Sequence, residues 1–247
     1  KAGRALRQQL PLQRLLPQLD PQRMKGSVIL VHMANPETFF ARRIYVSSDG
    51  KNLNRVYPGK KDGTISERIA EAITREVIDQ ATNLIDMHSG DGNESLRPYS
   101  YWSKTGRDPQ DRISREMVLA FGLDHIIVST GRPTDPNASI YLENTASTRG
   151  KPSITVEAGH AGTVTPEDVE ALVRGLRTST DSILSKSSHA DSRHRNRPDF
   201  RQHRLKIRPL PHGHKSFLPS FSSSSLSPWT TRTPRLTLVS DGNPRRR

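Results

Sequence analysis

The chain has 247 residues and a formal net charge of +13, from 38 Lys and Arg against 25 Asp and Glu. It contains no cysteine, which excludes disulfide frameworks, thiolate metal sites and cysteine nucleophiles. No apolar run approaches the roughly 20 residues of a membrane-spanning helix, so we expect no membrane span. No signal peptide is visible in the sequence, and we take a cytoplasmic location as the default expectation.

The charge divides the chain into two parts. Residues 185–247 hold 14 Lys and Arg against 3 Asp and Glu, which leaves 24 against 22 for residues 1–184. The second part is rich in Ser, Pro and His, ends in three arginines, and shows neither helical nor strand periodicity. A segment of this composition cannot bury a core. We therefore expect one domain at residues 1–184 and a disordered basic tail at residues 185–247.

Short apolar runs alternate with amphipathic helices in the first part. In chain order, the patterns predict a helix at 2–19, a strand at 27–33, a helix at 66–80 capped by Ser66, a strand at 83–87, a helix at 108–121, strands at 125–129 and 153–156, and a helix at 165–184. The last helix opens with a capping Thr, a Pro and two acids, which is a strong start signal. This alternation predicts an α/β fold, a three-layer sandwich with a largely parallel central sheet.

The segment Asp86-Met87-His88-Ser89-Gly90 follows a short apolar run, so we expect His88 where a buried strand ends. Ligands of open α/β sheets bind at that edge. An imidazole there, with Asp86 two residues before it, suits a metal ligand that a neighbouring carboxylate orients. By itself the motif is weak, because a single histidine at a strand end is more often a hydrogen-bonded structural residue.

Two further segments carry candidate site residues. Asn54 and Arg55 lie in a loop bounded by Gly and Pro, where the guanidinium fork and the amide suit a carboxylate. The alternative is an ordinary solvated arginine. Glu157 ends the β-rich run that begins at Ser153, and a carboxylate there fits a metal ligand or a general base that activates a metal-bound water. The alternative for Glu157 is a strand end that faces solvent.

In this order and spacing, the motifs resemble the succinylglutamate desuccinylase/aspartoacylase family, a branch of the zinc carboxypeptidase-like fold. The resemblance covers about residues 4–184 and rests on four segments: Val28-Ile29-Leu30-Val31 with Ala34-Asn35-Pro36, Asp49 to Arg55, Asp86 to Gly90, and Ile154 to Gly159. It implies that His88 is a zinc ligand and that Glu157 is the general base. It also implies that Asn54 and Arg55 grip the carboxylate of the substrate.

The chain departs from the family at the metal site. The resemblance implies two further zinc ligands, a His and a Glu three residues after it, just before the first helix. That helix is expected at 2–19, the chain opens with Lys1, and no such pair precedes it. Of the remaining histidines in the first part, His32, His125 and His160, none has a Glu three residues later. One protein ligand does not hold a catalytic zinc, so we expect a truncated N-terminus, weak zinc binding and impaired activity.

The C-terminal part departs as well. The resemblance implies a small β-rich domain after residue 184, and nothing in residues 185–247 resembles one. A reading-frame change would produce such a mixture, and we favour it over a selected RNA-binding tail. Lys and Arg neutralise phosphates without regard to sequence, but aromatic residues for base stacking are sparse in the tail.

Three functions from different classes remain. The first is a zinc-dependent deacylase that cleaves the amide of an N-acyl amino acid or similar small carboxylate. In this hypothesis the resemblance implies that Arg43, or less favourably Arg42, polarises the scissile carbonyl. A carboxypeptidase acting on peptides is its near neighbour. The second is a non-catalytic remnant of the family, and the third a protein that binds nucleic acid non-specifically through its tail.

Overall fold

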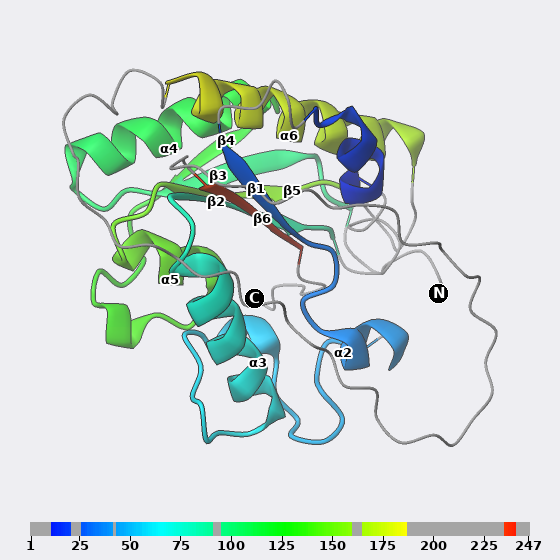
Figure 1. Ribbon diagram of the computed structural model, residues 1–247, viewed down its shortest axis with the longest axis vertical. Helices are drawn as coiled ribbons and strands as arrows, with labels where there is room; N and C mark the ends of the chain where they lie inside the picture. The colour runs from blue at the N-terminus through cyan, green and yellow to red at the C-terminus, as the bar shows by residue number, and fades with distance from the viewer. Residues whose placement is uncertain are drawn as a thin grey trace.

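The structure is a computed structural model that describes residues 11–20, 26–41, 43–90, 95–159, 165–186 and 235–240. Residues 2–10 of the expected first helix, and most of the expected tail, lie outside the described residues. A six-stranded sheet separates two layers of helices (Figure 1). This arrangement confirms the predicted α/β sandwich with a largely parallel sheet.

The sheet places the ends of its strands at two opposite edges. Its strands are β1 (Ser27–Val31), β2 (Asn83–His88), β3 (Tyr99–Ser103), β4 (Ile126–Ser129), β5 (Ser153–Glu157) and β6 (Arg235–Ser240), in the order β1-β6-β2-β5-β3-β4. β1, β6, β2 and β5 run parallel to one another. β3 is antiparallel to β5, and β4 runs parallel to β3. The carboxyl ends of β1, β6, β2 and β5 therefore share one edge, and those of β3 and β4 share the other.

Helices cover both faces of the sheet. They are α2 (Pro36–Ala41), α3 (Ile65–Ile73) with a π-helical turn at Thr74–Ile78, α4 (Asp108–Phe121), α5 (Leu142–Thr148) and α6 (Pro166–Lys186). Residues 11–15 are helical and are followed by a 3₁₀ turn at Leu16–Gln18. In Figure 1, α4 and α6 cover one face, and α3 and α5 lie on the other. Among the described residues, no helix is long and apolar enough to cross a membrane.

The core lies on both sides of the sheet, and strand alternation decides which residue joins which side. Ile85 and Met87 of β2 belong to the cluster that contains residues of α4 and α6. Leu84 belongs to the cluster that contains residues of α3 and α5. Because successive side chains alternate, Asp86 and His88 share the face of Leu84 and point toward α3 and α5.

The start of α3 differs from the sequence prediction by two residues. The cap is Thr64 and not Ser66: the Glu67 carboxylate accepts hydrogen bonds from the Thr64 N–H at 2.8 Å and from its hydroxyl at 3.1 Å. The Glu67 N–H in turn donates to the Thr64 side chain, and together with the bond from the Thr64 N–H this makes a capping box. Ser66 instead donates its N–H and its hydroxyl to the Asp49 carboxylate, at 2.8 and 2.9 Å. These bonds attach the loop before Asn54 to the start of α3.

Residues 235–240 differ from the expected tail, because they form the strand β6. Five residues of β6 pair with β1 and five with β2, so the strand is paired along both edges. Among the described strands, β1 pairs with β6 alone, and β6 therefore joins β1 to the sheet. The apolar run at 236–239 is too short to build a core by itself. Pairing on both sides supplies backbone hydrogen bonds that no local sequence pattern reports.

We predict that replacing Leu238 with Pro destabilises the fold. Leu238 lies opposite Leu30 on β1 and Ile85 on β2. Proline removes a backbone donor from a strand paired on both sides and cannot fit its middle, so the free energy of unfolding should fall by about 3 kcal/mol. Chemical denaturation measures it, with Leu238→Ala as the control that keeps the N–H. Equal stability of the two variants would show that β6 is dispensable.

Candidate active site

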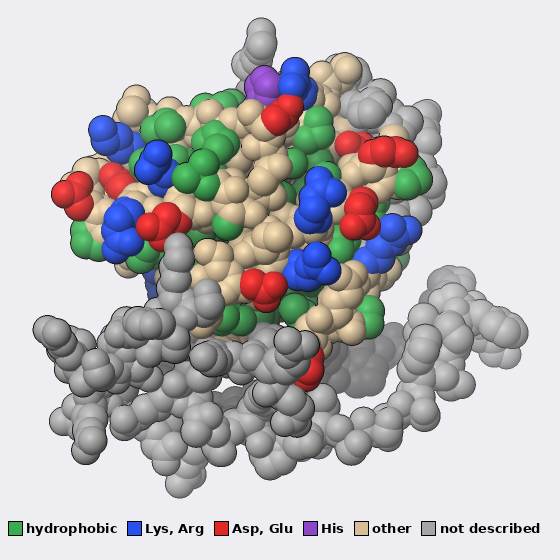
Figure 2. All heavy atoms as spheres, turned by 90° about the horizontal axis from the view of Figure 1, so that it is seen from above, with side chains coloured by type: hydrophobic (Ala, Val, Ile, Leu, Met, Phe, Trp, Pro, Cys, Tyr) green, Lys and Arg blue, Asp and Glu red, His purple; other side chains and the backbone are tan. Residues whose placement is uncertain are grey.

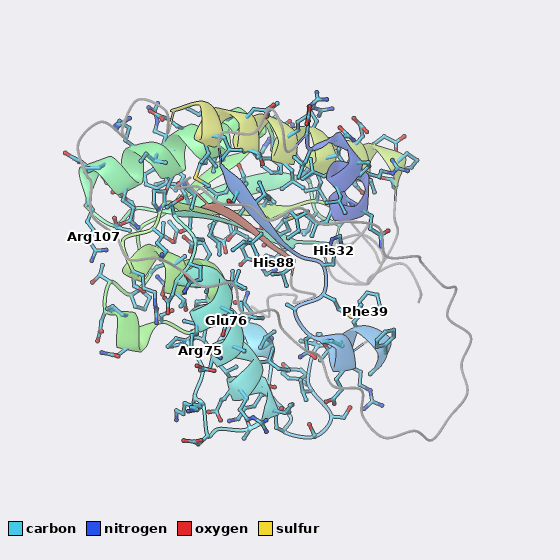
Figure 3. The ribbon with its side chains drawn as sticks, viewed as in Figure 1. His32, Phe39, Arg75, Glu76, His88 and Arg107 are labelled. Atoms are coloured by element: carbon cyan, nitrogen blue, oxygen red, sulfur yellow. The ribbon has the colours of Figure 1, made fainter. Side chains whose placement is uncertain are left out.

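His88 and Glu157 lie side by side at the carboxyl edge of the central strands. They are register partners at the ends of β2 and β5, and the Ala158 N–H donates to the His88 carbonyl at 3.2 Å. Both side chains are buried, with 5% and 6% of their surfaces exposed. Figure 3 places His88 below the sheet, on the side of α3 and α5. The sequence predicted both residues at strand ends, and the structure brings the two ends together.

Asp86 lies behind His88 on the same face of β2. Its Oδ2 is 3.0 Å from Nε2 of His88, and the carboxyl is only 1% exposed. The carboxyl and the imidazole are therefore in direct contact, and they form an ion pair when the ring is protonated. A carboxylate on one ring nitrogen fixes how the imidazole is turned and directs a ligand to Nδ1. The sequence predicted this local support from the spacing of two residues.

The backbones of the two loops that follow β2 and β5 are in close contact. The Gly90 N–H donates to the carbonyl of Gly159 at 3.2 Å. A Cβ atom on Gly90 would lie 2.8 Å from that carbonyl oxygen, which is closer than real contacts allow. Gly159 has a φ of +108°, a conformation that side chains rarely permit. Glycine is therefore required at both positions, immediately after the two strands that carry the site residues.

Asn54 has a structural role in addition to the ligand-binding role that the sequence predicted. It lies in a 3₁₀ turn at Leu53–Arg55, is buried, and its Oδ1 accepts a hydrogen bond of 2.7 Å from the backbone N–H of Leu142. Leu142 is the first residue of α5, so Asn54 satisfies one of the helix donors that has no partner within the helix. Its Nδ2 makes no hydrogen bond to the residues that the structure describes, and it is the group that could reach a ligand.

Arg55 lies beside an aromatic ring that a second arginine shares. Its Cζ is 4.8 Å from the centre of the Tyr141 ring, and its Nη1 donates to the Asn54 carbonyl at 2.7 Å. The Cζ of Arg132 is 3.9 Å from the same ring. Both distances allow cation–π attraction. The ring and the Asn54 carbonyl therefore hold Arg55. Sequence reasoning identified neither Tyr141 nor Arg132, because no local pattern links them to Arg55.

Arg43 makes no described contact with the other candidate site residues. Its side chain is exposed, and its backbone N–H donates to the carbonyl of Thr38, which lies in the first half of α2. Over the described part of the chain, no hydrogen bond or ion pair joins Arg43 to His88 or Glu157. Arg42 lies outside the described residues. The assignment of Arg43 to the scissile carbonyl stays a prediction.

Glu143 is a buried acid that sequence reasoning missed. It lies in the first turn of α5 and accepts hydrogen bonds from the hydroxyls of Ser153 at 2.8 Å and Ser103 at 3.0 Å. Burial raises the pKa of Glu143 to about 7, against the lowering effect of these two bonds. The charge of Asp86 raises it further, while Arg132 lowers it. No local pattern could reveal this residue, because its partners come from β3 and β5.

The donors at the site do not complete a zinc centre. No group of three His, Asp or Glu side chains that could hold a metal occurs among the residues whose placement the structure describes. His88 stands where the sequence placed a ligand, but His125 is exposed and bonded to Asp124, and His160 lies outside the described residues. A catalytic zinc usually has three protein ligands. These residues alone therefore do not fit the metal.

A buried imidazole and a buried carboxylate at neighbouring strand ends, beneath a mostly parallel sheet, occur here on the zinc carboxypeptidase-like fold. The chain belongs to the succinylglutamate desuccinylase/aspartoacylase family, because the model of its catalytic domain matches residues 10–183. The predicted family and fold are thus confirmed.

Relatives of known sequence and structure agree with this assignment. The N-alpha-acetyl-L-2,4-diaminobutyric acid deacetylase of Halomonas elongata is 31% identical over 165 residues, 67% of this chain and 47% of the relative. An aspartoacylase family protein from Mesorhizobium loti is 28% identical with a TM-score of 0.61, over 74% of this chain and 55% of that one. An ectoine utilization protein from Ruegeria pomeroyi, in a product-bound structure, is 23% identical with a TM-score of 0.65, over 74% and 54%. The chain spans about half the length of these relatives.

We predict that Glu143 makes stability fall as pH rises. Its pKa of about 7 in the folded chain exceeds the ordinary 4.5, so the unfolded chain releases this proton first. The stabilisation is therefore complete below about pH 4.5 and lost through pH 7, by on the order of 3 kcal/mol. Glu143→Gln cannot ionise and should lack this loss, whereas the exposed Glu170→Gln should keep it. Urea denaturation between pH 4.5 and 8 measures the difference, and identical slopes in the wild type and Glu143→Gln would contradict the prediction.

Proposed function

We propose that this chain carries the active-site half of a deacylase, a hydrolase that cleaves the amide of an N-acyl amino acid or similar small carboxylate. The observation that carries the proposal is the adjacent burial of His88 and Glu157 at one edge of the sheet. The Halomonas elongata relative supports the substrate class, because its name describes removal of an acetyl group from an amino acid.

Glu157 is assigned the proton transfers. A carboxylate at the end of β5, excluded from bulk water, can accept a proton from the attacking water and return it to the amine that leaves. His88, oriented by Asp86, is assigned as the one zinc ligand that the described residues supply. The other ligands are absent from the described residues.

Asn54 and Arg55 are assigned to the carboxylate of the substrate. The amide Nδ2 of Asn54 and the guanidinium of Arg55 are neutral and charged donors from successive residues of one turn. The bond from Leu142 to Asn54 and the ring of Tyr141 restrict the two side chains before any ligand arrives. Arg43 is kept as the donor for the oxygen of the scissile carbonyl, from the exposed loop after α2.

Three other functions would leave different features in this chain. A carboxypeptidase would use the same three kinds of residue and release an amino acid as well, so only the acyl part of the amide, a peptide or a small acyl group, separates it from the deacylase. A remnant without activity follows if no zinc binds, since the sequence contains no His followed three residues later by Glu. A nucleic-acid function would rest on the tail, since on the α4 and α6 face acidic and basic side chains are interspersed (Figure 2).

We predict that Arg55→Lys weakens capture of a carboxylate ligand by about tenfold, although it keeps the charge. Lysine lacks the planar fork that binds both carboxylate oxygens. Calorimetric titration with an N-acetyl amino acid measures the dissociation constant without requiring turnover. Arg68→Lys is the matched control, because Arg68 is an exposed residue of α3 with no described partner. Unchanged affinity in Arg55→Lys would remove Arg55 from the carboxylate site.

We predict that the 247-residue chain binds less than one equivalent of zinc and is inactive. His88 is one ligand where three are usual, and no group of three ligating side chains occurs among the described residues. Adding a His-x-x-Glu segment ahead of Lys1 should raise zinc affinity by orders of magnitude and allow hydrolysis of an N-acetyl amino acid. Elemental analysis that finds one zinc per unmodified chain, lost in His88→Ala, would contradict the expected impairment.

A further inference from the structure

A basic hollow lies at the edge of the sheet opposite His88 and Glu157. It opens where β3 and β4 end, beside the C-terminal end of α5, and its lining residues are Ser103, Lys104, Thr105, Arg107, Arg132, Pro133, Thr134, Asn144, Ser147 and Thr148. Ser153 starts β5 near this edge and Glu157 ends it, four residues or about 13 Å further along the strand. Figure 3 shows Arg107 and His88 well apart. The hollow thus lies away from His88 and Glu157, although Arg132 of its lining shares the Tyr141 ring with Arg55 of the proposed substrate site.

Three cations and no acid line the hollow. Lys104, Arg107 and Arg132 form no ion pair with any carboxylate of the described residues. Several other cations of the described chain do lie against acids, as in Lys51–Glu67, Arg112–Glu116 and Arg149–Asp79. Like charges gathered in a concave surface raise the local concentration of anions. The unbalanced charge therefore favours an anionic occupant.

The acids near the hollow are engaged behind it. Ser103 donates its hydroxyl to Glu143, and Thr105 donates its hydroxyl and N–H to Asp111. Neither carboxylate belongs to the lining, although the charge of Arg132 acts on Glu143 and lowers its pKa. Arg107 reaches the last carbonyls of α5, Ser147 at 3.4 Å and Thr148 at 3.5 Å, which are long contacts for hydrogen bonds. The guanidinium therefore keeps most of its donors for a ligand.

Asn144, in the lining of the hollow, has a buried acceptor without a hydrogen-bond partner among the described residues. Its side chain is 99% buried, since only 1% of its surface is exposed. Its Nδ2 donates to the Pro133 carbonyl at 3.0 Å and to the Ser147 hydroxyl at 3.2 Å, which fixes the orientation of the amide. Its Oδ1 has no hydrogen-bond partner among the described residues. An unsatisfied buried acceptor costs free energy, so a ligand that donates a proton to it is favoured.

We propose that this hollow binds inorganic hydrogen phosphate. The oxyanion supplies negative charge for Lys104, Arg107 and Arg132, and its P–OH group supplies the donor that Asn144 Oδ1 lacks. Arginine and lysine bind phosphate oxygens through charge-assisted hydrogen bonds. Sulfate has the same shape and charge but carries no proton at neutral pH, so it satisfies the cations and not the amide oxygen. The site therefore prefers hydrogen phosphate to sulfate.

Titration calorimetry of the full chain with inorganic phosphate at constant ionic strength tests the proposal. The wild type should bind one phosphate per chain, and Lys104→Gln and Arg107→Gln should each weaken binding about tenfold or more, because each removes one charge-assisted contact. Lys61→Gln, an exposed lysine with no described partner, should bind as the wild type does. Circular dichroism of each variant confirms that the fold is kept.

Each outcome decides the question. A saturable phosphate signal that the two hollow variants lose and Lys61→Gln keeps, with sulfate at least several-fold weaker, establishes the site. No saturable binding in the wild type overturns it. Equal binding in Lys104→Gln, Arg107→Gln and the wild type places the ion elsewhere and also overturns it. Equal affinity for sulfate and phosphate removes the role of Asn144 and rejects hydrogen phosphate as the ligand. None of these readouts depends on zinc or on hydrolysis.

Discussion

The parallel pairing of β2 with β5 is the constraint on which the rest of the site depends. It sets His88 opposite Glu157 and Asp86 opposite Thr155, with all four on the face that α3 and α5 cover. A shift of one residue in this register would turn either strand's polar residues into the apolar layer beneath α4 and α6. Ile85 and Ile154 pack in the apolar layer beneath α4 and α6. Their burial there therefore keeps the polar side chains of β2 and β5 on the opposite face, toward α3 and α5.

Helix α5 is held by polar groups rather than by its length. With seven residues it could not persist alone, and its first donor is satisfied by Asn54, 88 residues away in the chain. Glu143 fastens the same helix to β3 and β5 through Ser103 and Ser153. The carboxylate of Asp49 in turn binds the start of α3. Partial burial pushes the pKa of Asp49 up, but the N–H groups of Ser66 and Lys51 outweigh it and lower that pKa.

The two edges of the sheet have opposite chemical character. The edge where β2 and β5 end presents the His88 imidazole in contact with the Asp86 carboxylate, and the edge where β3 and β4 end presents three cations. The reversed direction of β3 and β4 creates this difference, because their carboxyl ends lie where the central strands begin. Arg132 lines the basic hollow and also contacts Tyr141, whose ring lies over Arg55, so α5 and its flanking residues connect the two regions.

The sequence by itself determined the family, the α/β class, the extents of α4 and α6 to within two residues, and the strand-end positions of His88 and Glu157. Each of these follows from local periodicity, capping or a contiguous motif. Only the tertiary structure decided the burial of Glu143, the capping of α5 by Asn54, and the insertion of β6 between β1 and β2. These depend on partners distant in the chain, and a hydrogen bond between distant residues leaves no period in the sequence of either one.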